Sequence, residues 1–193
     1  MQGVKITLNP VVQRQRQDAS DLAVTLLDTG ARLSEIGTIP WSSMDVVDWR
    51  WIDLYRSKVG NSSRLTMTGR LREVMQRRYA ARGNSAYVFP GYGDDGEDTP
   101  RGKSTHAIRR AIERARLNSN PAQVKRDGRA TAHTFRDTFA SWLVQRGVSL
   151  FKVQMLLGHS DPRMTQKYAK LAPGAVADEA AAVLDGIWSE RAA

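Results

Sequence analysis

The 193-residue sequence contains no cysteine, which excludes disulfides, thiolate metal sites and a cysteine nucleophile. It has no apolar run long enough for a membrane span and no charged N-terminal segment followed by an apolar block, so neither a span nor a secretory signal is expected. Internal repeats and low-complexity segments are also absent. Hydrophobic residues make up 41% of the chain, enough for a core, so the sequence predicts one folded domain.

Acidic residues are scarce relative to basic ones, 20 against 29, which gives a net charge of +9. Residues 101–136 hold ten Arg or Lys and two acidic residues, a net charge of +8, whereas residues 171–193 carry −3. A basic surface gains counterion release when it binds phosphates, so this distribution favours a polyanionic partner on one face. The alternative is a basic protein whose charge serves only solubility.

The densest group of carboxylates is Asp94, Asp95, Glu97 and Asp98, in a glycine-containing stretch. A metal-dependent nuclease or transposase needs clustered carboxylates that hold two ions. An acidic run among glycine and proline is more typical of a solvated loop, so we expect no metal site. A nucleotide-binding glycine loop is also missing.

The residue pattern predicts a mainly helical α+β domain with a small antiparallel sheet. We expect a polar lead-in over residues 1–17, the folded domain over 18–173 and a tail helix over 174–193. Strands are expected at 46–55 and near 64–67, joined by a turn at 58–61. Helices are expected from Asp18 or Ser20 to Gly30 and over 71–82, 104–117, 132–146, 149–157 and from 161 onward, with loops at 91–102 and 118–129.

Residues with acid–base and nucleophilic chemistry gather near the C-terminal end. His133 and Arg136 are three residues apart, which places both on one face of a helix, about 5–6 Å apart at Cβ. Two cationic donors side by side suit a phosphate, whose transition-state charge they can share. His159 follows an expected helix end, and Tyr168 lies nine residues later between two lysines. Taken singly, each of these residues is more often structural or solvated.

Together, these segments resemble the sequence boxes of the tyrosine recombinases, the phage integrase family. The segment His133-Thr134-Phe135-Arg136 is similar to the H-x-x-R box of that family, and His159 and Tyr168 follow at family-like spacings of 23 and nine residues. Upstream, the segment that contains Arg32 and Glu35 looks like the first arginine box. The resemblance covers roughly residues 20–172.

The resemblance implies the catalytic domain of a site-specific recombinase or integrase, with the tyrosine recombinase fold. Such a domain cleaves and rejoins duplex DNA through a covalent 3′-phosphotyrosine, here at Tyr168. Arg32 and Arg136 are expected to clamp the scissile phosphate, since guanidinium forks match two phosphate oxygens. A free tyrosine has a pKa of about 10, and surrounding positive charge would favour its phenolate.

The resemblance implies the other roles as well. His159 is expected to donate to the same phosphate, and His133 to orient the site and to help take the tyrosine proton. Lys58, in the hairpin turn, matches the general acid that protonates the departing 5′ oxygen. Glu35 is expected to orient Arg32.

Two positions depart from the family pattern. After the hairpin turn the family usually has valine-proline-leucine, whereas this chain has Leu65-Thr66-Met67, which shifts the register of Lys58 by up to one residue. Asp137 stands where many relatives carry histidine, a position outside the catalytic set.

The implied partners are duplex DNA, gripped mostly by its backbone, and other protomers of the chain in a synaptic complex. No metal or other cofactor is implied, and the phosphotyrosine link retains the energy of the broken bond, so ATP is not needed. Some basic side chains of the central region are expected to be simply solvated. The expected DNA-binding face comprises Arg101, Lys103, Arg109, Arg110, Arg114, Arg116, Lys125 and Arg126.

The apolar residues Val183, Leu184 and Ile187 recur at helical spacing in the tail. Two interpretations stay open: the tail packs on its own domain or, as relatives suggest, docks on a neighbouring protomer. A type IB topoisomerase and a non-catalytic DNA-binding regulator are the alternatives to a recombinase. Because full-length relatives carry an N-terminal helical domain, we expect a catalytic fragment that acts in the bacterial cytoplasm and comes from a bacterium, a phage or a mobile element.

Overall fold

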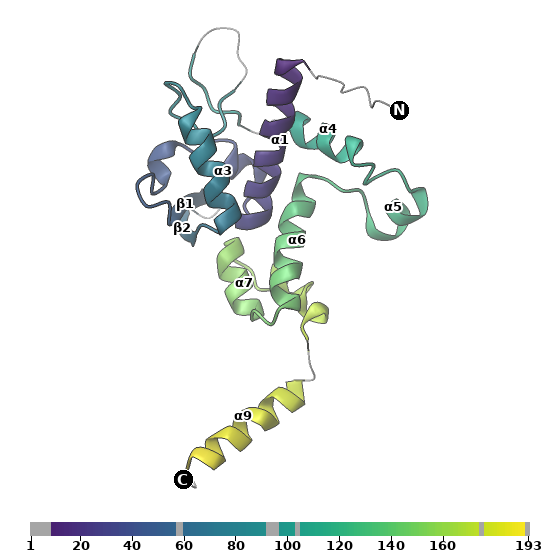
Figure 1. Cartoon of the computed structure of the whole chain (residues 1–193). Coiled ribbons are helices and arrows are strands. Elements are labelled where there is room, and N and C mark those ends of the chain that lie inside the picture. Colours follow the sequence, from purple (N-terminus) through teal and green to yellow (C-terminus); the bar gives the residue numbers. More distant parts are fainter. Residues whose placement is uncertain (1–8, 57–59, 92–96, 103–104, 174–175, 192–193) are drawn as a thin grey trace, which may run out of the picture.

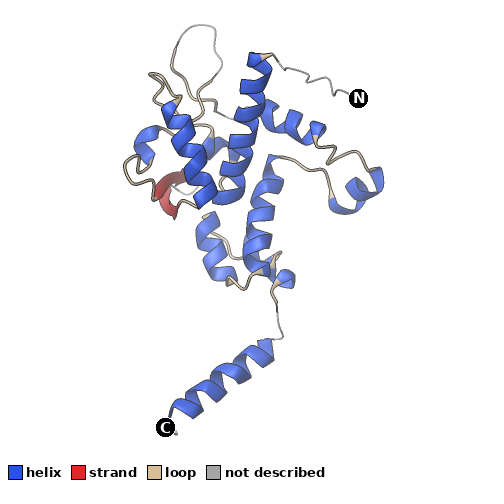
Figure 2. Ribbon diagram, viewed as in Figure 1, coloured by secondary structure: helices blue, strands red, loops and turns tan. Residues whose placement is uncertain are grey.

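The structure is a computed structural model that describes residues 9–56, 60–91, 97–102, 105–173 and 176–191. Helices dominate it, and its described strands form one two-stranded antiparallel sheet, so the predicted α+β class is confirmed (Figure 2). The elements are α1 (Pro10–Thr29), α2 (Leu33–Ile36), the 3-10 helix η1 (Trp41–Ser43), β1 (Trp51–Arg56), β2 (Asn61–Thr66), α3 (Gly69–Ala80), α4 (His106–Arg114), α5 (Pro121–Asp127), α6 (Ala132–Gln145), α7 (Leu150–Leu157), α8 (Arg163–Gln166), the 3-10 helix η2 (Ala169–Leu171) and α9 (Val176–Arg191).

Helix α1 lies at the centre of the body, in contact with α3, α4 and α6 (Figure 1). It starts where the Asn9 side chain accepts a hydrogen bond from the N–H of Val11 and Pro10 occupies the first turn. The expected start at Asp18 or Ser20 is therefore wrong, and residues 10–17 are helix rather than a polar lead-in.

The predicted hairpin is confirmed: β1 pairs with β2 and places Arg56 opposite Asn61. The first strand starts at Trp51 rather than near Val46. The cause is the preceding turn, in which the Asp45 carboxylate accepts three backbone hydrogen bonds and so holds the chain out of an extended conformation.

Buried apolar side chains form two clusters. The larger cluster joins α1, α3, the hairpin and α4, and the smaller one joins α6, α7 and the turn that contains Tyr168. Helix α6 packs against both, with Phe135 on the larger cluster and Ala140 and Val144 inside the smaller one. The C-terminal part of the body thus has its own apolar cluster, which α6 and α7 connect to the larger one.

Two further expectations about local structure are wrong. Residues expected to be a loop contain α5, because Asn120 caps it by accepting hydrogen bonds from the backbone of Ala122 and Gln123. Tyr168 was expected on a helix that starts at residue 161, but α8 is only four residues long and Tyr168 lies in the turn that follows it.

Helix α9 stands apart from the rest of the body (Figure 1). Its apolar side chains Val183, Leu184 and Ile187 are exposed, so in this structure the tail does not pack on its own domain. None of the described helices is both long enough and apolar enough to cross a membrane.

Candidate active site

The end of α1 brings Arg32 into place. Gly30 caps the helix in the left-handed conformation, with φ of 60°, and a Cβ there would lie 2.4 Å from the Phe139 ring. Glycine is therefore required both for its backbone angle and for the close packing of α1 on α6. Arg32 then starts α2, and its backbone N–H and Nη1 each donate to Glu35 at 2.8 Å. The carboxylate thus contacts both the backbone and the guanidinium of Arg32.

Arg56 is a buried member of the site that the sequence did not reveal. Its side chain is fully buried, and its Nη1 lies 3.3 Å from the second oxygen of Glu35. Its Nε donates to Ser63 Oγ at 3.0 Å and its Nη2 to the carbonyl oxygen of Leu156 at 2.5 Å. The guanidinium thus joins α2, the hairpin and the C-terminal end of α7, where the helix dipole favours positive charge.

Arg136 is also buried, and it bridges the two apolar clusters. Its Nη1 donates to the carbonyl oxygen of Gly30 at 2.7 Å and its Nη2 to that of Leu157 at 2.6 Å. Burial, followed by the nearby charges of Arg32 and Arg56, lowers the pKa of Arg136 to about 10. The protein therefore holds this cation where water solvates it poorly.

Three guanidinium groups and one carboxylate thus share this region. Arg32 and Arg56 face opposite oxygens of Glu35, and Arg136 interacts electrostatically with both arginines and with Glu35. The cluster carries an excess of two positive charges. Poorly solvated excess charge is costly unless an opposite charge joins it, so the arrangement can bind an anion.

His159 follows the end of α7 and borders the same cluster. Its Nδ1 lies 2.8 Å from Oγ1 of the buried Thr165. Burial, followed by the charges of Arg136 and Arg32, lowers the pKa of His159 to about 4, so the ring is neutral at pH 7. If the Thr165 hydroxyl donates to Nδ1, the ring proton lies on Nε2 and can be donated to an anion.

Tyr168 is buried in the smaller cluster, with its hydroxyl held by α6. The phenol donates to Asp137 Oδ1 at 2.5 Å, and Lys167 Nζ donates to the same oxygen at 2.7 Å. Arg136, the neighbour of Asp137 on α6, interacts electrostatically with Tyr168. Asp137 was placed outside the catalytic set by family resemblance, yet it is the residue that contacts the phenol.

Of the two remaining expected catalytic residues, the structure describes one. His133 is mostly exposed at the start of α6, with its Nε2 3.9 Å from Asp137 Oδ1. Lys58 lies outside the described residues. The structure thus brings Arg32, Glu35, Arg136, His159 and Tyr168 together, with His133 at the rim.

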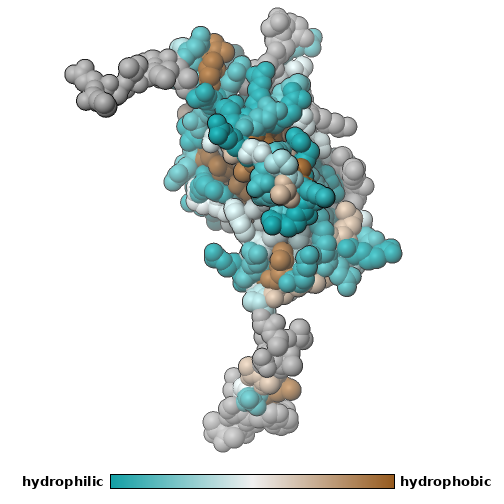
Figure 3. Space-filling model, turned by 90° about the vertical axis from the view of Figure 1, so that its right-hand side faces the viewer, coloured by the Kyte–Doolittle hydropathy of each residue, from teal (hydrophilic) through white to brown (hydrophobic). Residues whose placement is uncertain are grey.

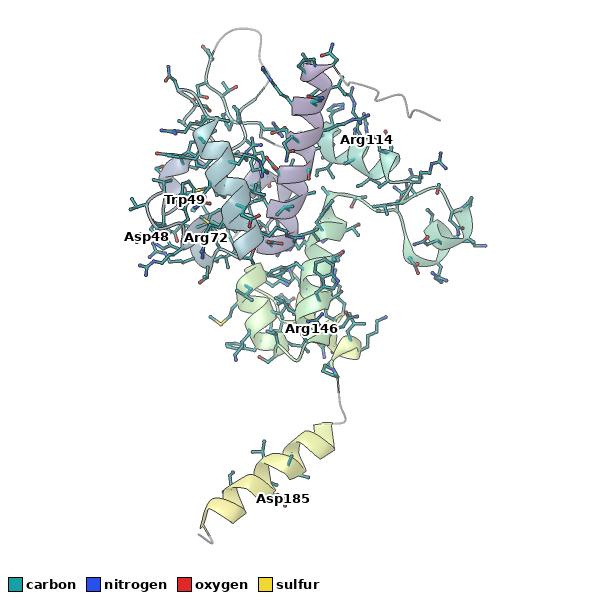
Figure 4. All side chains as sticks on the ribbon, in the orientation of Figure 1. Asp48, Trp49, Arg72, Arg114, Arg146 and Asp185 are labelled. Atoms are coloured by element: carbon teal, nitrogen blue, oxygen red, sulfur yellow. The ribbon has the colours of Figure 1, made fainter. Side chains whose placement is uncertain are left out.

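The expected DNA-binding face needs one correction. The Arg101 side chain is only 4% exposed and lies 2.6 Å from the Asp18 carboxylate, so Arg101 supports the packing of α1 rather than facing a partner. Lys103 lies outside the described residues. The six remaining basic residues are exposed on or near α4 and α5; one of them, Arg114, is labelled in Figure 4, and the face that carries them is mostly hydrophilic in Figure 3. They are Arg109, Arg110, Arg114, Arg116, Lys125 and Arg126.

Among the described residues, no group of three or more His, Asp or Glu side chains could hold a metal ion. In the acidic stretch, Asp94 and Asp95 lie outside the described residues. Asp98 accepts hydrogen bonds from Ser85 Oγ and the N–H of Ala86, so it joins this stretch to the segment that follows α3.

The chain belongs to the phage integrase family, because the sequence profile of the "Phage integrase family" matches residues 7–174. It is 29% identical over 153 residues to the tyrosine recombinase XerD of Brucella abortus, which covers 76% of this chain and 46% of that protein. It is 27% identical over 160 residues to the integrase of Salmonella phage P22, covering 80% of this chain and 39% of that one. The chain thus spans less than half the length of these relatives.

Solved structures agree on the fold. The XerH site-specific recombinase bound to a palindromic difH substrate superposes with a TM-score of 0.65 at 20% identity, over 94% of this chain and 49% of that one. The catalytic domain of bacteriophage HP1 integrase superposes with a TM-score of 0.54 at 20% identity, over 86% and 88% of the two chains. The fold is therefore that of tyrosine recombinase catalytic domains.

Proposed function

We propose that this chain is the catalytic domain of a site-specific tyrosine recombinase that cleaves and rejoins duplex DNA without metal or ATP. The observation that carries the proposal is the buried cluster of Arg32, Arg56 and Arg136 with the single carboxylate of Glu35, beside the hydroxyl-bearing turn of Tyr168. A phosphodiester is the anion that this cluster binds. Bacterial and phage relatives support action on DNA in the bacterial cytoplasm.

The reaction proceeds by attack of the Tyr168 phenol oxygen on phosphorus. The bond from phosphorus to the 5′ oxygen breaks, and the 3′-phosphate becomes esterified to Tyr168. Arg32 and Arg136 donate to the non-bridging oxygens, where charge develops in the transition state. His159 donates Nε2–H to the same phosphate, and this neutral ring becomes easier to protonate once the anion offsets the arginine charges.

The remaining steps concern protons and site shape. Lys58 protonates the departing 5′ oxygen, and His133 orients the rim of the site. Arg56 supports the cluster, since its own donors are directed at Glu35, Ser63 and the C-terminal end of α7. Rejoining reverses the sequence, with the 5′ hydroxyl as the nucleophile.

The DNA backbone lies along the exposed basic side chains of α4 and α5. If six phosphates are engaged, affinity falls by about 10³-fold or more between low and moderate salt. A shallow salt dependence would contradict this face.

Other copies of the chain complete the working assembly, and α9 is the arm that docks on a neighbouring protomer. The exposed row of Val183, Leu184 and Ile187 supports this role. Deleting the residues after Pro173 should leave the body folded and remove or deregulate assembly on DNA. A truncated protein that loses its fold would show that α9 packs on its own domain.

A pool of nicked duplexes with randomised core sequences tests the chemistry, because the nick lets the cleaved end diffuse away and traps the intermediate. We expect a protein–DNA adduct that resists denaturant and is absent in Tyr168→Phe. DNA binding without an adduct would indicate a regulator. Relaxation of supercoiled plasmid by isolated monomers would indicate a topoisomerase.

A further inference from the structure

The hydrogen bond between Asp137 and the Tyr168 hydroxyl is not used by any step of the proposed function. Asp137 Oδ1 accepts a hydrogen bond from the Tyr168 hydroxyl, with 2.5 Å between the two oxygens, in the range of a strong hydrogen bond to a charged acceptor. Lys167 Nζ anchors the same oxygen at 2.7 Å and lies 4.9 Å from the centre of the Tyr168 ring. The carboxylate therefore fixes both the position and the hydrogen-bond direction of the attacking group.

We propose that Asp137 holds the Tyr168 hydroxyl for attack and accepts its proton as the phenol oxygen bonds to phosphorus. The proposal rests on the proposed function. As the new P–O bond forms and the P–O5′ bond breaks, the Tyr168 O–H bond breaks and its proton moves to Asp137 Oδ1. The departing 5′ oxygen takes a different proton, the one that Lys58 supplies in the proposed function. On rejoining, the neutral carboxylic acid of Asp137 returns the proton to the leaving phenol.

The electrostatics around the pair agree with this transfer. Burial and the hydrogen bond to Asp137 both raise the pKa of Tyr168 above its ordinary value, so a phenolate does not form before the reaction. Burial also opposes ionisation of Asp137, but hydrogen bonds from Lys167 and Tyr168 outweigh it and hold the pKa of Asp137 below its ordinary value. At neutral pH the acceptor is charged and the donor is neutral. Protein kinases use the same pairing, with an Asp that accepts the proton of a substrate hydroxyl.

Besides Tyr168 and Lys167, the titratable group of His133 also faces Asp137, with its Nε2 3.9 Å from the same oxygen. Because Tyr168 donates to the carboxylate, Asp137 is the immediate proton acceptor. His133 lies behind it, on the exposed side of α6. The expectation that His133 helps to take the tyrosine proton thereby changes to a secondary role through Asp137.

Single-turnover cleavage of the nicked duplex pool by Asp137→Asn tests the proposal. Asparagine keeps the shape and an acceptor oxygen but cannot take the proton. We expect adduct formation to slow by about 10²-fold or more, with DNA affinity unchanged. We also expect the variant's rate to rise with pH across the neutral range, where the wild-type rate is flat, because hydroxide must then remove the proton.

Asp48→Asn is the matched control, since this exposed carboxylate lies at the edge of the body, away from α6 (Figure 4); its rate should equal that of the wild type. Asp137→Glu keeps the carboxylate and should keep the flat pH profile, which decides the question if the Asn variant does not fold. Three results for Asp137→Asn would overturn the proposal. One is a faster cleavage rate, which would mean that the contact holds Tyr168 back from attack. The others are an unchanged rate and a slower rate with the wild-type pH profile. Failure of the wild type itself to form an adduct would instead reject the proposed function.

Discussion

Replacing Glu35 with glutamine tests whether one carboxylate holds the cation cluster together. The Glu35 side chain is 3% exposed, and its two oxygens lie 2.8 and 3.3 Å from Arg32 and Arg56. Glutamine keeps the shape and one acceptor oxygen but removes the negative charge that faces both guanidinium groups. The fully buried Arg56 is affected most, because water cannot replace the lost partner.

The size of the effect follows from the burial of the pairs. Removing one partner of a buried ion pair costs about 3–5 kcal/mol, and the lower end applies because Arg32 is partly exposed to water. A loss of about 3 kcal/mol lowers the Tm of a domain of this size by about 6–12 °C. Thermal unfolding followed by circular dichroism measures this shift. Inorganic phosphate should raise the Tm of Glu35→Gln more than that of the wild type, because an anion replaces the missing charge.

Glu113→Gln is the matched control, since Glu113 also faces an arginine but is 66% exposed, with 3.9 Å between Arg109 Nε and its carboxylate. We expect a change of about 0.5 kcal/mol or less from this exposed pair. The reasoning is refuted if Glu35→Gln and Glu113→Gln unfold at the same temperature and respond equally to phosphate.

Three further changes give distinct results. Gly30→Ala should lower the free energy of unfolding in urea by more than Gly83→Ala does. Both glycines have positive φ, of 60° and 58°, but of the two only Gly30 has a side chain within 4 Å of the added Cβ. Equal losses of free energy would contradict this packing. The folded-state pKa of His159, about 4, lies below the ordinary 6.5, so the unfolded chain binds a proton at higher pH than the folded one. The contribution of His159 to stability should therefore be complete above about pH 6.5 and fall as the pH drops toward 4. In urea unfolding, His159→Gln should reduce the dependence of stability on pH in this range. Arg114→Ala should reduce the slope of log affinity against log salt, measured by filter binding, by about 0.9. Arg101→Ala should leave that slope unchanged and lower the unfolding temperature measured by calorimetry. The opposite pattern would reverse the two assignments.

Features with local signals were predictable from the sequence. Helices α6 and α7 and the glycines that end α1 and α7 appear where capping residues and periodicity indicated them. The spacing of His133 and Arg136 predicted a shared helix, and both lie on α6. The hairpin turn was predicted because turn residues separate two short apolar segments.

Features that depend on distant partners were not predictable. Arg56 reads as a solvated strand residue, but its partners Glu35 and Leu156 lie 21 and 100 residues away. Arg101 was wrongly predicted to lie on the DNA-binding face for a similar reason. Its buried partner, Asp18, lies on α1, far away in the sequence. The role of Asp137 likewise depends on Tyr168, 31 residues further along the chain. Local patterns carry no information about these contacts.

The division of the apolar interior into two clusters has a consequence for local unfolding of the domain. Arg32 and Arg56 lie on or beside elements of the larger cluster, whereas Tyr168 belongs to the smaller one and His159 follows α7. Arg136, through Gly30 and Leu157, and Arg56, through Leu156, join the two parts. Local unfolding of the smaller cluster would separate the proposed phosphate-binding side chains while the larger cluster stays folded. Amide hydrogens of α7 should then exchange sooner than those of α1, and a bound phosphodiester, by bridging the two parts, should slow that exchange selectively.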